Sequence, residues 1–141
     1  MTKSVIIAVD AMGGDNSPTK VINGISEYIK KNTDVYFRIF GKKNEVESEI
    51  SKNSIKKDFF EIIDCEDIVE NNDTPLTAAK KKNTSMWKAI NDVKEKKSNV
   101  IISAGNTGAL FVISKLNINM IENISKPALA ALWPNKIDMN I

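Results

Sequence analysis

The stretch Val100-Ile101-Ile102-Ser103-Ala104-Gly105-Asn106-Thr107-Gly108-Ala109-Leu110 runs from apolar residues through small polar ones into a helical pattern. Its apolar start predicts a buried strand. Ser103, Gly105 and Gly108 carry little or no side chain, so backbone N–H groups there can approach an anion at the N-terminus of the following helix. The same residues also fit a tight strand-to-helix turn capped by Asn106 or Thr107. The stretch therefore predicts a phosphate-binding loop or, as the alternative, a structural turn.

Two common phosphate-binding loops are excluded by the spacing. Gly105 and Gly108 lie three residues apart, no third glycine accompanies them, and no Lys-Ser or Lys-Thr pair follows. The stretch is therefore neither a dinucleotide fingerprint nor a Walker loop. A nucleotide-linked oxidoreductase is accordingly a minor alternative.

A second candidate loop follows the first predicted strand. Residues 5–9 are apolar without alternation, which is typical of a strand covered on both faces of a parallel sheet. Asp10, the Gly13-Gly14 pair and Asp15 come directly after it, where open α/β sheets bind ligands. The alternative is a simple turn, with the two aspartates as turn and cap residues.

The remaining pattern alternates helices and strands. Ser17 is the expected N-cap of a helix over residues 18–31. We further predict a strand over 35–40 closed by Gly41, a weaker helix over 43–51 and a strand over 59–64. An acidic loop over 65–72, with one helical turn at most near Asp67, leads to a long helix that starts at Thr74-Pro75 and breaks near Asn83. A helix over 107–115 and a last strand over 127–134 complete the pattern. The tail from residue 135 shows no element. This order predicts a single α/β domain over residues 1–141, with a mainly parallel sheet flanked by helices.

The composition of the chain argues against several classes of function. The 20 basic residues nearly balance the 18 acidic ones, which argues against a dedicated nucleic-acid groove. The chain has one cysteine and no histidine, so it offers no internal disulfide, no zinc site and no Ser-His-Asp or Cys-His machinery. No apolar run approaches the roughly 18 residues of a membrane span, and residues 1–3 lead into a strand rather than a signal peptide. A reducing, cytoplasmic compartment fits best.

Two charged segments are further candidates. The acidic loop carries Glu66, Asp67, Glu70 and Asp73, and although paired carboxylates can act as acid and base, a solvated surface is the simpler reading. The lysines at positions 80–82 lie early in the long predicted helix. A solvated face is their default role, but one of them can reach an anion at a neighbouring strand end.

Four ordered motifs resemble those of the bacterial phosphate acyltransferases, the acyl-acyl carrier protein:phosphate acyltransferases. They are I-A-V-D-A-M-G-G-D at 7–15, T-P-L-T-A-A-K-K-K-N-T-S-M-W at 74–87, S-A-G-N-T-G-A at 103–109 and K-P-A-L-A at 126–130. The third motif is the most specific. Asn16 stands where many members have histidine, and the basic cluster is all lysine where the family tends to place arginine, which loses bidentate phosphate recognition.

The resemblance implies an α/β/α fold related to phosphotransacetylases and isocitrate dehydrogenase-like enzymes. It also implies transfer of a fatty acyl group from acyl carrier protein to inorganic phosphate, which supplies acyl phosphate to a membrane-bound glycerol-3-phosphate acyltransferase of phospholipid synthesis. We further expect a homodimer without metal or organic cofactor, cytoplasmic and at most peripheral at the membrane. Family chains are about twice as long, so the sequence resembles an amino-terminal half that lacks the later Leu-Asp-x-Gly-Ala-Asn and Asp-Gly-Phe-x-Gly-Asn motifs. A catalytically inactive remnant that binds an anion or a partner is the alternative.

Candidate site residues follow from the predicted strand ends and these motifs. The expected catalytic residues are Asp10, Asp15, Lys80, Lys81 and Asn106. The expected phosphate- and substrate-binding residues are Gly13, Gly14, Lys82, Ser103, Gly105, Thr107 and Gly108. Phosphate attack on an activated thioester mainly needs the reactants to be held together and the oxyanion to be stabilised, so no covalent intermediate on the protein is expected.

Overall fold

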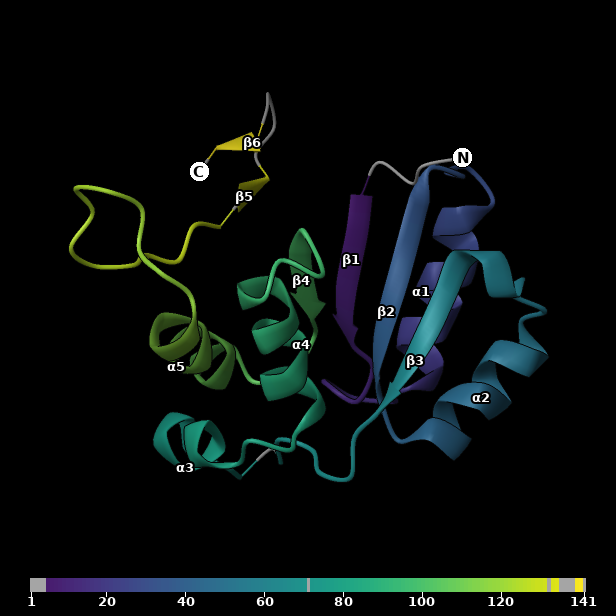
Figure 1. Cartoon of the computed structure of the whole chain (residues 1–141), viewed down its shortest axis with the longest axis horizontal. Coiled ribbons are helices and arrows are strands. Elements are labelled where there is room, and N and C mark those ends of the chain that lie inside the picture. The colour runs from purple at the N-terminus through teal and green to yellow at the C-terminus, as the bar shows by residue number, and fades with distance from the viewer. Residues whose placement is uncertain (1–4, 71, 132, 135–138, 141) are drawn as a thin grey trace.

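The computed structural model describes residues 5–70, 72–131, 133–134 and 139–140. At its centre lies a sheet of four parallel strands in the order β3-β2-β1-β4 (Figure 1). The strands are β1 (Val5–Asp10), β2 (Val35–Gly41), β3 (Phe60–Asp64) and β4 (Val100–Ser103). Because all four run in one direction, their carboxyl ends and the loops that follow meet at one edge of the sheet. The predicted α/β class is confirmed.

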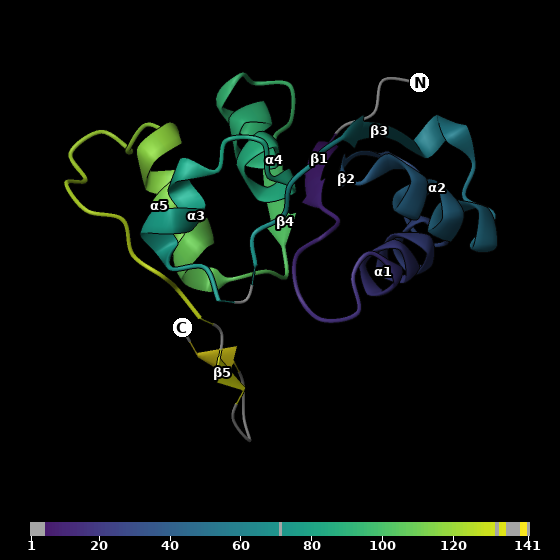
Figure 2. The same ribbon diagram turned by 90° about the horizontal axis from the view of Figure 1, so that it is seen from below.

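Helices lie on both sides of this sheet. They are α1 (Thr19–Ile29), α2 (Lys43–Lys52), α3 (Pro75–Lys80), α4 (Ser85–Lys94) and α5 (Thr107–Asn117), with a short 3-10 turn at Lys57–Phe59. In two perpendicular views α1 and α2 cover one face, α4 covers the other, and α3 and α5 pack beyond α4 (Figures 1 and 2). The helices α1, α2 and α5 lie within two residues of the predicted bounds.

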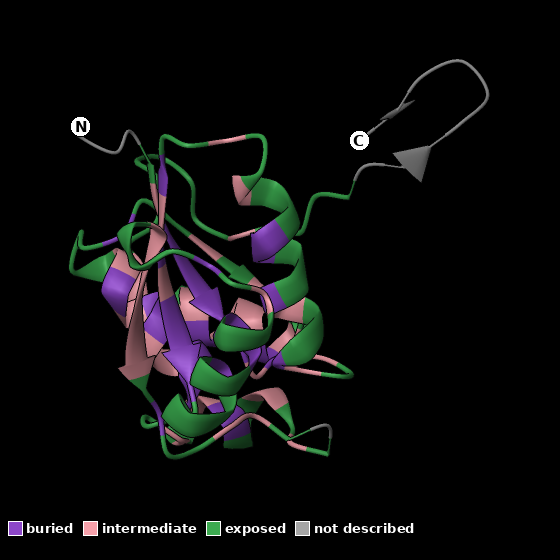
Figure 3. Cartoon of the chain, turned by 90° about the vertical axis from the view of Figure 1, so that its right-hand side faces the viewer, coloured by how far each residue is buried: buried purple, intermediate pink, exposed green. Residues whose placement is uncertain are grey.

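The core is divided by β1, whose apolar run faces both layers. Ile7 and Val9 belong to the cluster shared with α1 and α2, whereas Ala8 belongs to a cluster with Cys65 and Ala89 on the α4 side. Buried residues accordingly concentrate on the inner strands (Figure 3). A strand without apolar alternation is therefore covered on both faces here, as predicted.

The predicted burial of the strand at 100–102 is wrong. Val100 is 43% exposed and Ile102 is 52% exposed, whereas Ile101 packs toward α4. The physical reason is position: β4 is an outer strand, and α1 packs against β1 and β2 rather than over β4. A short apolar run does not reveal whether its strand ends up inside the sheet or at its edge.

The long helix expected after Thr74 is broken, as predicted, near Asn83. The Thr74 hydroxyl accepts a hydrogen bond from the Thr77 N–H at 3.2 Å and caps α3. The Thr84 hydroxyl accepts one from the Trp87 N–H at 3.2 Å and starts α4. Two capping threonines therefore begin two helices, one on each side of the break.

One local prediction is wrong. Ser17 does not cap α1: Pro18 takes the N-cap position, and the Ser17 hydroxyl donates to the Gly13 carbonyl at 2.6 Å. The Ser17 side chain binds the backbone of the preceding loop and therefore does not accept a hydrogen bond from the first turn of α1. The segment after β3 is a loop, as predicted, without a helical turn near Asp67, and Asp67 makes an isolated parallel bridge with Thr84.

The predicted strand over 127–134 is also wrong, because residues 127–131 form none. A two-residue strand β5 (Trp133–Pro134) pairs antiparallel with β6 (Met139–Asn140), an element that the sequence did not indicate. None of residues 127–131 pairs with a strand of the main sheet in the described part of the chain, and a strand needs a pairing partner. Residue 132 and the rest of the tail, 135–138 and 141, lie outside the described residues.

Candidate functional site

Asp10 lies at the carboxyl end of β1 and is only 2% exposed. Its Oδ1 accepts a hydrogen bond from the Ser85 hydroxyl at 2.6 Å, and its Oδ2 accepts one from the Ser103 hydroxyl at 2.7 Å. The Met12 N–H lies 3.3 Å from Oδ1. One buried carboxylate thus joins the loop after β1, the start of α4 and the end of β4. Hydrogen bonds to a charged acceptor in a buried setting are strong, so this cluster fixes the relative positions of three segments.

Ser103 extends the connection into the loop after β4. Its Oγ also accepts a hydrogen bond from the Gly105 N–H at 3.1 Å. The Gly105 amide is therefore used by the fold and is not an open donor for an anion, as was expected of it. The Asp10 carboxylate, through Ser103, orients the loop instead.

Asn106 caps α5. Its Oδ1 accepts a hydrogen bond from the Ala109 N–H at 2.9 Å, which satisfies one of the free amides of the first turn. The N–H groups of Thr107 and Gly108 donate to no residue that the structure describes. The predicted phosphate-binding loop therefore retains two main-chain donors without a described acceptor, at the positive end of the 11-residue helix α5.

The glycines explain how closely the loops approach. A Cβ on Gly13 would lie 2.5 Å from Asp10 Oδ2, 2.8 Å from the Gly105 nitrogen and 2.9 Å from Ser103 Oγ. Gly14 has a φ of 86°, and a Cβ there would lie 2.5 Å from the Ala104 carbonyl oxygen. The Gly13-Gly14 loop and the β4–α5 loop therefore pack backbone to backbone, which only residues without a side chain allow.

Lys81 is the predicted lysine that the fold brings near this loop. Its Nζ lies 2.7 Å from Asp73 Oδ2, and the Asp73 carbonyl lies 3.4 Å from Asn106 Nδ2. The hydrogen bond from Lys81 lowers the pKa of the Asp73 carboxyl below its usual value. Part of the positive charge of Lys81 is thus already balanced by an aspartate that the sequence placed on a solvated surface.

The other predicted charges are held less firmly. Asp15, Lys80 and Lys82 are exposed, and none of their side chains makes a hydrogen bond or ion pair with a described residue. Of the two predicted catalytic aspartates, Asp10 is therefore bound within the fold and Asp15 faces solvent.

Two residues of the cluster had no role in the sequence analysis. Ser85 donates to Asp10, and the Met86 methyl would lie 2.9 Å from a Cβ on Gly105. Both belong to the T-S-M-W end of the second motif, so the motif itself was the available signal. Within the described ranges, His, Cys, Asp and Glu side chains nowhere form a group of three or more able to hold a metal ion.

Comparison with known proteins decides the family. The family described as "Fatty acid synthesis protein" matches residues 5–141. The chain belongs to this family. Its relatives include a phosphate acyltransferase of Pelagibacter ubique, which is 58% identical over 142 residues. Phosphate acyltransferases of Neorickettsia sennetsu and Clostridium acetobutylicum are each 41% identical, over 137 and 133 residues. The resemblance predicted from the four motifs is confirmed.

The chain matches only part of the length of those relatives. The match covers 100% of the chain but 42% of the Pelagibacter protein, and 95% and 94% of the chain but 40% of each of the other two. The chain therefore spans about two fifths of the length of the relatives. Among the residues that the structure describes, every helix is too short or too polar to span a bilayer.

Proposed function

We propose that this chain takes part in the transfer of a fatty acyl group from acyl carrier protein to inorganic phosphate. The names of its relatives, phosphate acyltransferases, support acyl transfer to phosphate, and the two open amides of Thr107 and Gly108 support an anion at the start of α5. The single observation that carries the proposal is the junction of Asp10, Ser103 and Gly105, because it holds these donors at the ligand-binding edge of a parallel sheet.

In the proposed reaction a phosphate oxygen attacks the thioester carbonyl carbon. The carbon–sulfur bond breaks, acyl phosphate forms, and the thiol of acyl carrier protein leaves with the proton that phosphate gives up. The Thr107 and Gly108 amides hold phosphate or the developing oxyanion, and Lys81 adds positive charge. Asp10 acts as a positioning residue, because both its oxygens already accept hydrogen bonds. Asp15 is the exposed carboxylate that can take up a proton or orient phosphate.

The proposal includes the partners that the resemblance implies. These are acylated acyl carrier protein, inorganic phosphate, a second copy of the chain in a homodimer, and a membrane-bound glycerol-3-phosphate acyltransferase that consumes the product. A cytoplasmic location, at most peripheral at the membrane, and a reaction without metal or organic cofactor belong to the same proposal.

A second candidate is a catalytically inactive remnant that binds an anion or a partner. It is favoured by the coverage of about two fifths of the relatives and by the outer position of β4 in the described sheet. Half of a site would retain anion binding and lose the opposing wall of the cleft.

One assay separates the two candidates. Purified protein is incubated with acyl-acyl carrier protein, and phosphate-dependent release of the carrier thiol is measured. Turnover that falls by two or more orders of magnitude in the double variant Asn106→Ala, Thr107→Ala supports the proposal, because that variant disturbs the cap and the first turn of α5. Lys56→Ala, on an exposed lysine after α2 that belongs to no candidate site, is the control and should retain turnover, whereas Lys82→Ala tests the predicted role of that charge separately. Absence of turnover, with phosphate binding retained in calorimetry, would favour the remnant.

A further inference from the structure

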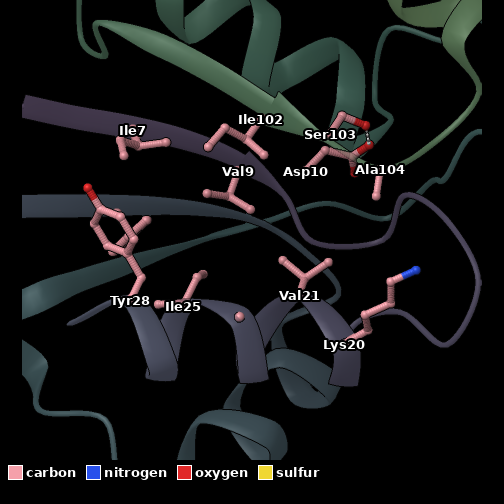
Figure 4. A pocket seen from close by; sticks show the side chains of 12 residues that line it. Ile7, Val9, Asp10, Lys20, Val21, Ile25, Tyr28, Ile102, Ser103 and Ala104 are labelled. Carbon is pink, nitrogen blue, oxygen red and sulfur yellow. Dashed lines mark hydrogen bonds between the residues drawn. The ribbon is translucent and has the colours of Figure 1, made fainter. Parts of the chain in front are cut away.

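A cavity of about 400 Å³ lies between α1 and the adjoining face of β1 and β4 (Figure 4). We call it the apolar groove and define it by Ile7, Val9, Val21, Gly24, Ile25 and Ile102. The charged and serine side chains of its lining, Asp10, Lys20 and Ser103, lie toward one end in the close-up, whereas Ile7 and the Tyr28 ring lie toward the other, with the Tyr28 hydroxyl at the far margin (Figure 4). A long apolar space with polar groups at one end suits an amphiphile.

We propose that the apolar groove binds the aliphatic chain of the fatty acyl substrate, with the reacting carbonyl at the Ser103–Ala104 end. This inference rests on the proposed function, and it adds the place of the chain. The groove adjoins the proposed site because Asp10 and Ser103, which belong to the junction that holds the β4–α5 loop, also line the groove. Its volume lies within the roughly 300 to 1,000 Å³ of small-molecule pockets.

Gly24 is the residue that keeps the groove open. It sits inside α1, where glycine is less favourable than alanine, and its φ is not in the left-handed region. A Cβ at this position would have no atom within 4 Å, so no close approach of another element requires glycine there. The missing side chain leaves the space between Val21 and Ile25 free for a ligand.

Exposed apolar area at the groove indicates a ligand of limited size. Ile102 is 52% exposed and Tyr28 is 49% exposed, and an aliphatic chain between them would remove apolar surface from water. The surface that these few side chains expose is much smaller than the area of about 800 Å² per partner that a standard protein interface buries. The polar end, shared with the phosphate loop, further favours a fatty acyl chain over a second copy.

The test uses alkylphosphonates as probes, at concentrations where they are monomeric. Isothermal titration should give a dissociation constant that falls about threefold to fourfold for each added methylene from octyl- to dodecylphosphonate, as expected for methylene burial. Gly24→Leu fills the groove and also favours the helix, so it should weaken dodecylphosphonate binding at least tenfold while the protein stays folded. Asn23→Leu places the same side chain on the neighbouring exposed position of α1 and should bind like the wild type.

Four results would overturn the inference. The first two are an affinity for the probe that does not depend on chain length and an unchanged affinity in Gly24→Leu. The third is a wild-type dimer in sedimentation that Gly24→Leu dissociates, in a protein that does not bind the probe. The fourth is loss of probe binding when the unmatched part of the Pelagibacter protein is added. Should circular dichroism show Gly24→Leu unfolded, Ile102→Asn on the opposite wall carries the test, with a severalfold loss of affinity expected. Probe binding with this pattern but without acyl transfer would count against the proposed function and leave the groove as an amphiphile site.

Discussion

Replacing Gly13 by alanine tests the contact between the two loops that build the site. The new methyl carbon would lie 2.5 Å from Asp10 Oδ2, 2.8 Å from the Gly105 nitrogen and 2.9 Å from Ser103 Oγ. None of these atoms is the end of a flexible side chain: one is backbone, and the other two are fixed by their mutual hydrogen bond. The loops must therefore move apart.

The cost follows from this overpacking. Forcing one methyl group into a closely packed site costs about 1 to 3 kcal/mol, and the involvement of backbone and of a buried carboxylate places Gly13→Ala near the upper end. In a chain of 141 residues this corresponds to a loss of about 6 to 9 °C in the melting temperature. Separation of the loops should also loosen the Ser103–Gly105 bond and weaken phosphate binding.

Gly24→Ala is the matched control, because it adds the same methyl group with no atom within 4 Å. It should raise stability by about 0.5 to 1 kcal/mol, as expected for a helix interior. Both variants are compared with wild type by calorimetry and urea denaturation. A Gly13→Ala protein as stable as Gly24→Ala would refute the close approach and, with it, the proposed positioning of the β4–α5 loop.

Three further predictions concern other buried or paired groups. Arg38→Met should cost about 3 kcal/mol in urea denaturation, because Asp92, 5% exposed and bound to Arg38 at 2.8 and 3.0 Å, would lose its cation; a loss under about 1 kcal/mol would argue against that pair. Burial raises the pKa of the Cys65 thiol from 9.0 to about 11. The native thiol should therefore react far more slowly with dithionitrobenzoate at pH 8 than the thiol of the unfolded chain. Because the fold favours the neutral thiol, about 3 kcal/mol of stability that is present below pH 9 should be lost as the pH rises through 11. The ionised Asp73 carboxylate, whose pKa is lowered in the folded protein, contributes stability at pH values above its usual pKa, and this stability is lost as the pH falls through the pKa of the folded state. Asp73→Asn should therefore reduce the loss of stability at acidic pH. An unchanged acid limb of the stability–pH curve would mean that Lys81 does not hold this carboxylate.

The sequence by itself determined the local elements and the family. Thr74-Pro75 fixed a capped helix start, the unalternated residues 5–9 fixed a strand covered on both faces, and the motif at 103–109 pointed to the relatives that comparison confirmed. These features depend on hydrogen bonds and periodicities within a few neighbouring residues, so the order of residues is enough to predict them.

Only the tertiary structure decided what surrounds Asp10. Ser85 and Ser103 are 75 and 93 residues away from it along the chain, and they meet its carboxylate because β4 pairs beside β1 and α4 packs across both. The strand order also left Ile102 open to solvent and placed an apolar groove next to the site. Strand order and helix packing arise from long-range burial, and residue spacing along the chain does not encode which distant hydroxyl will reach a given carboxylate.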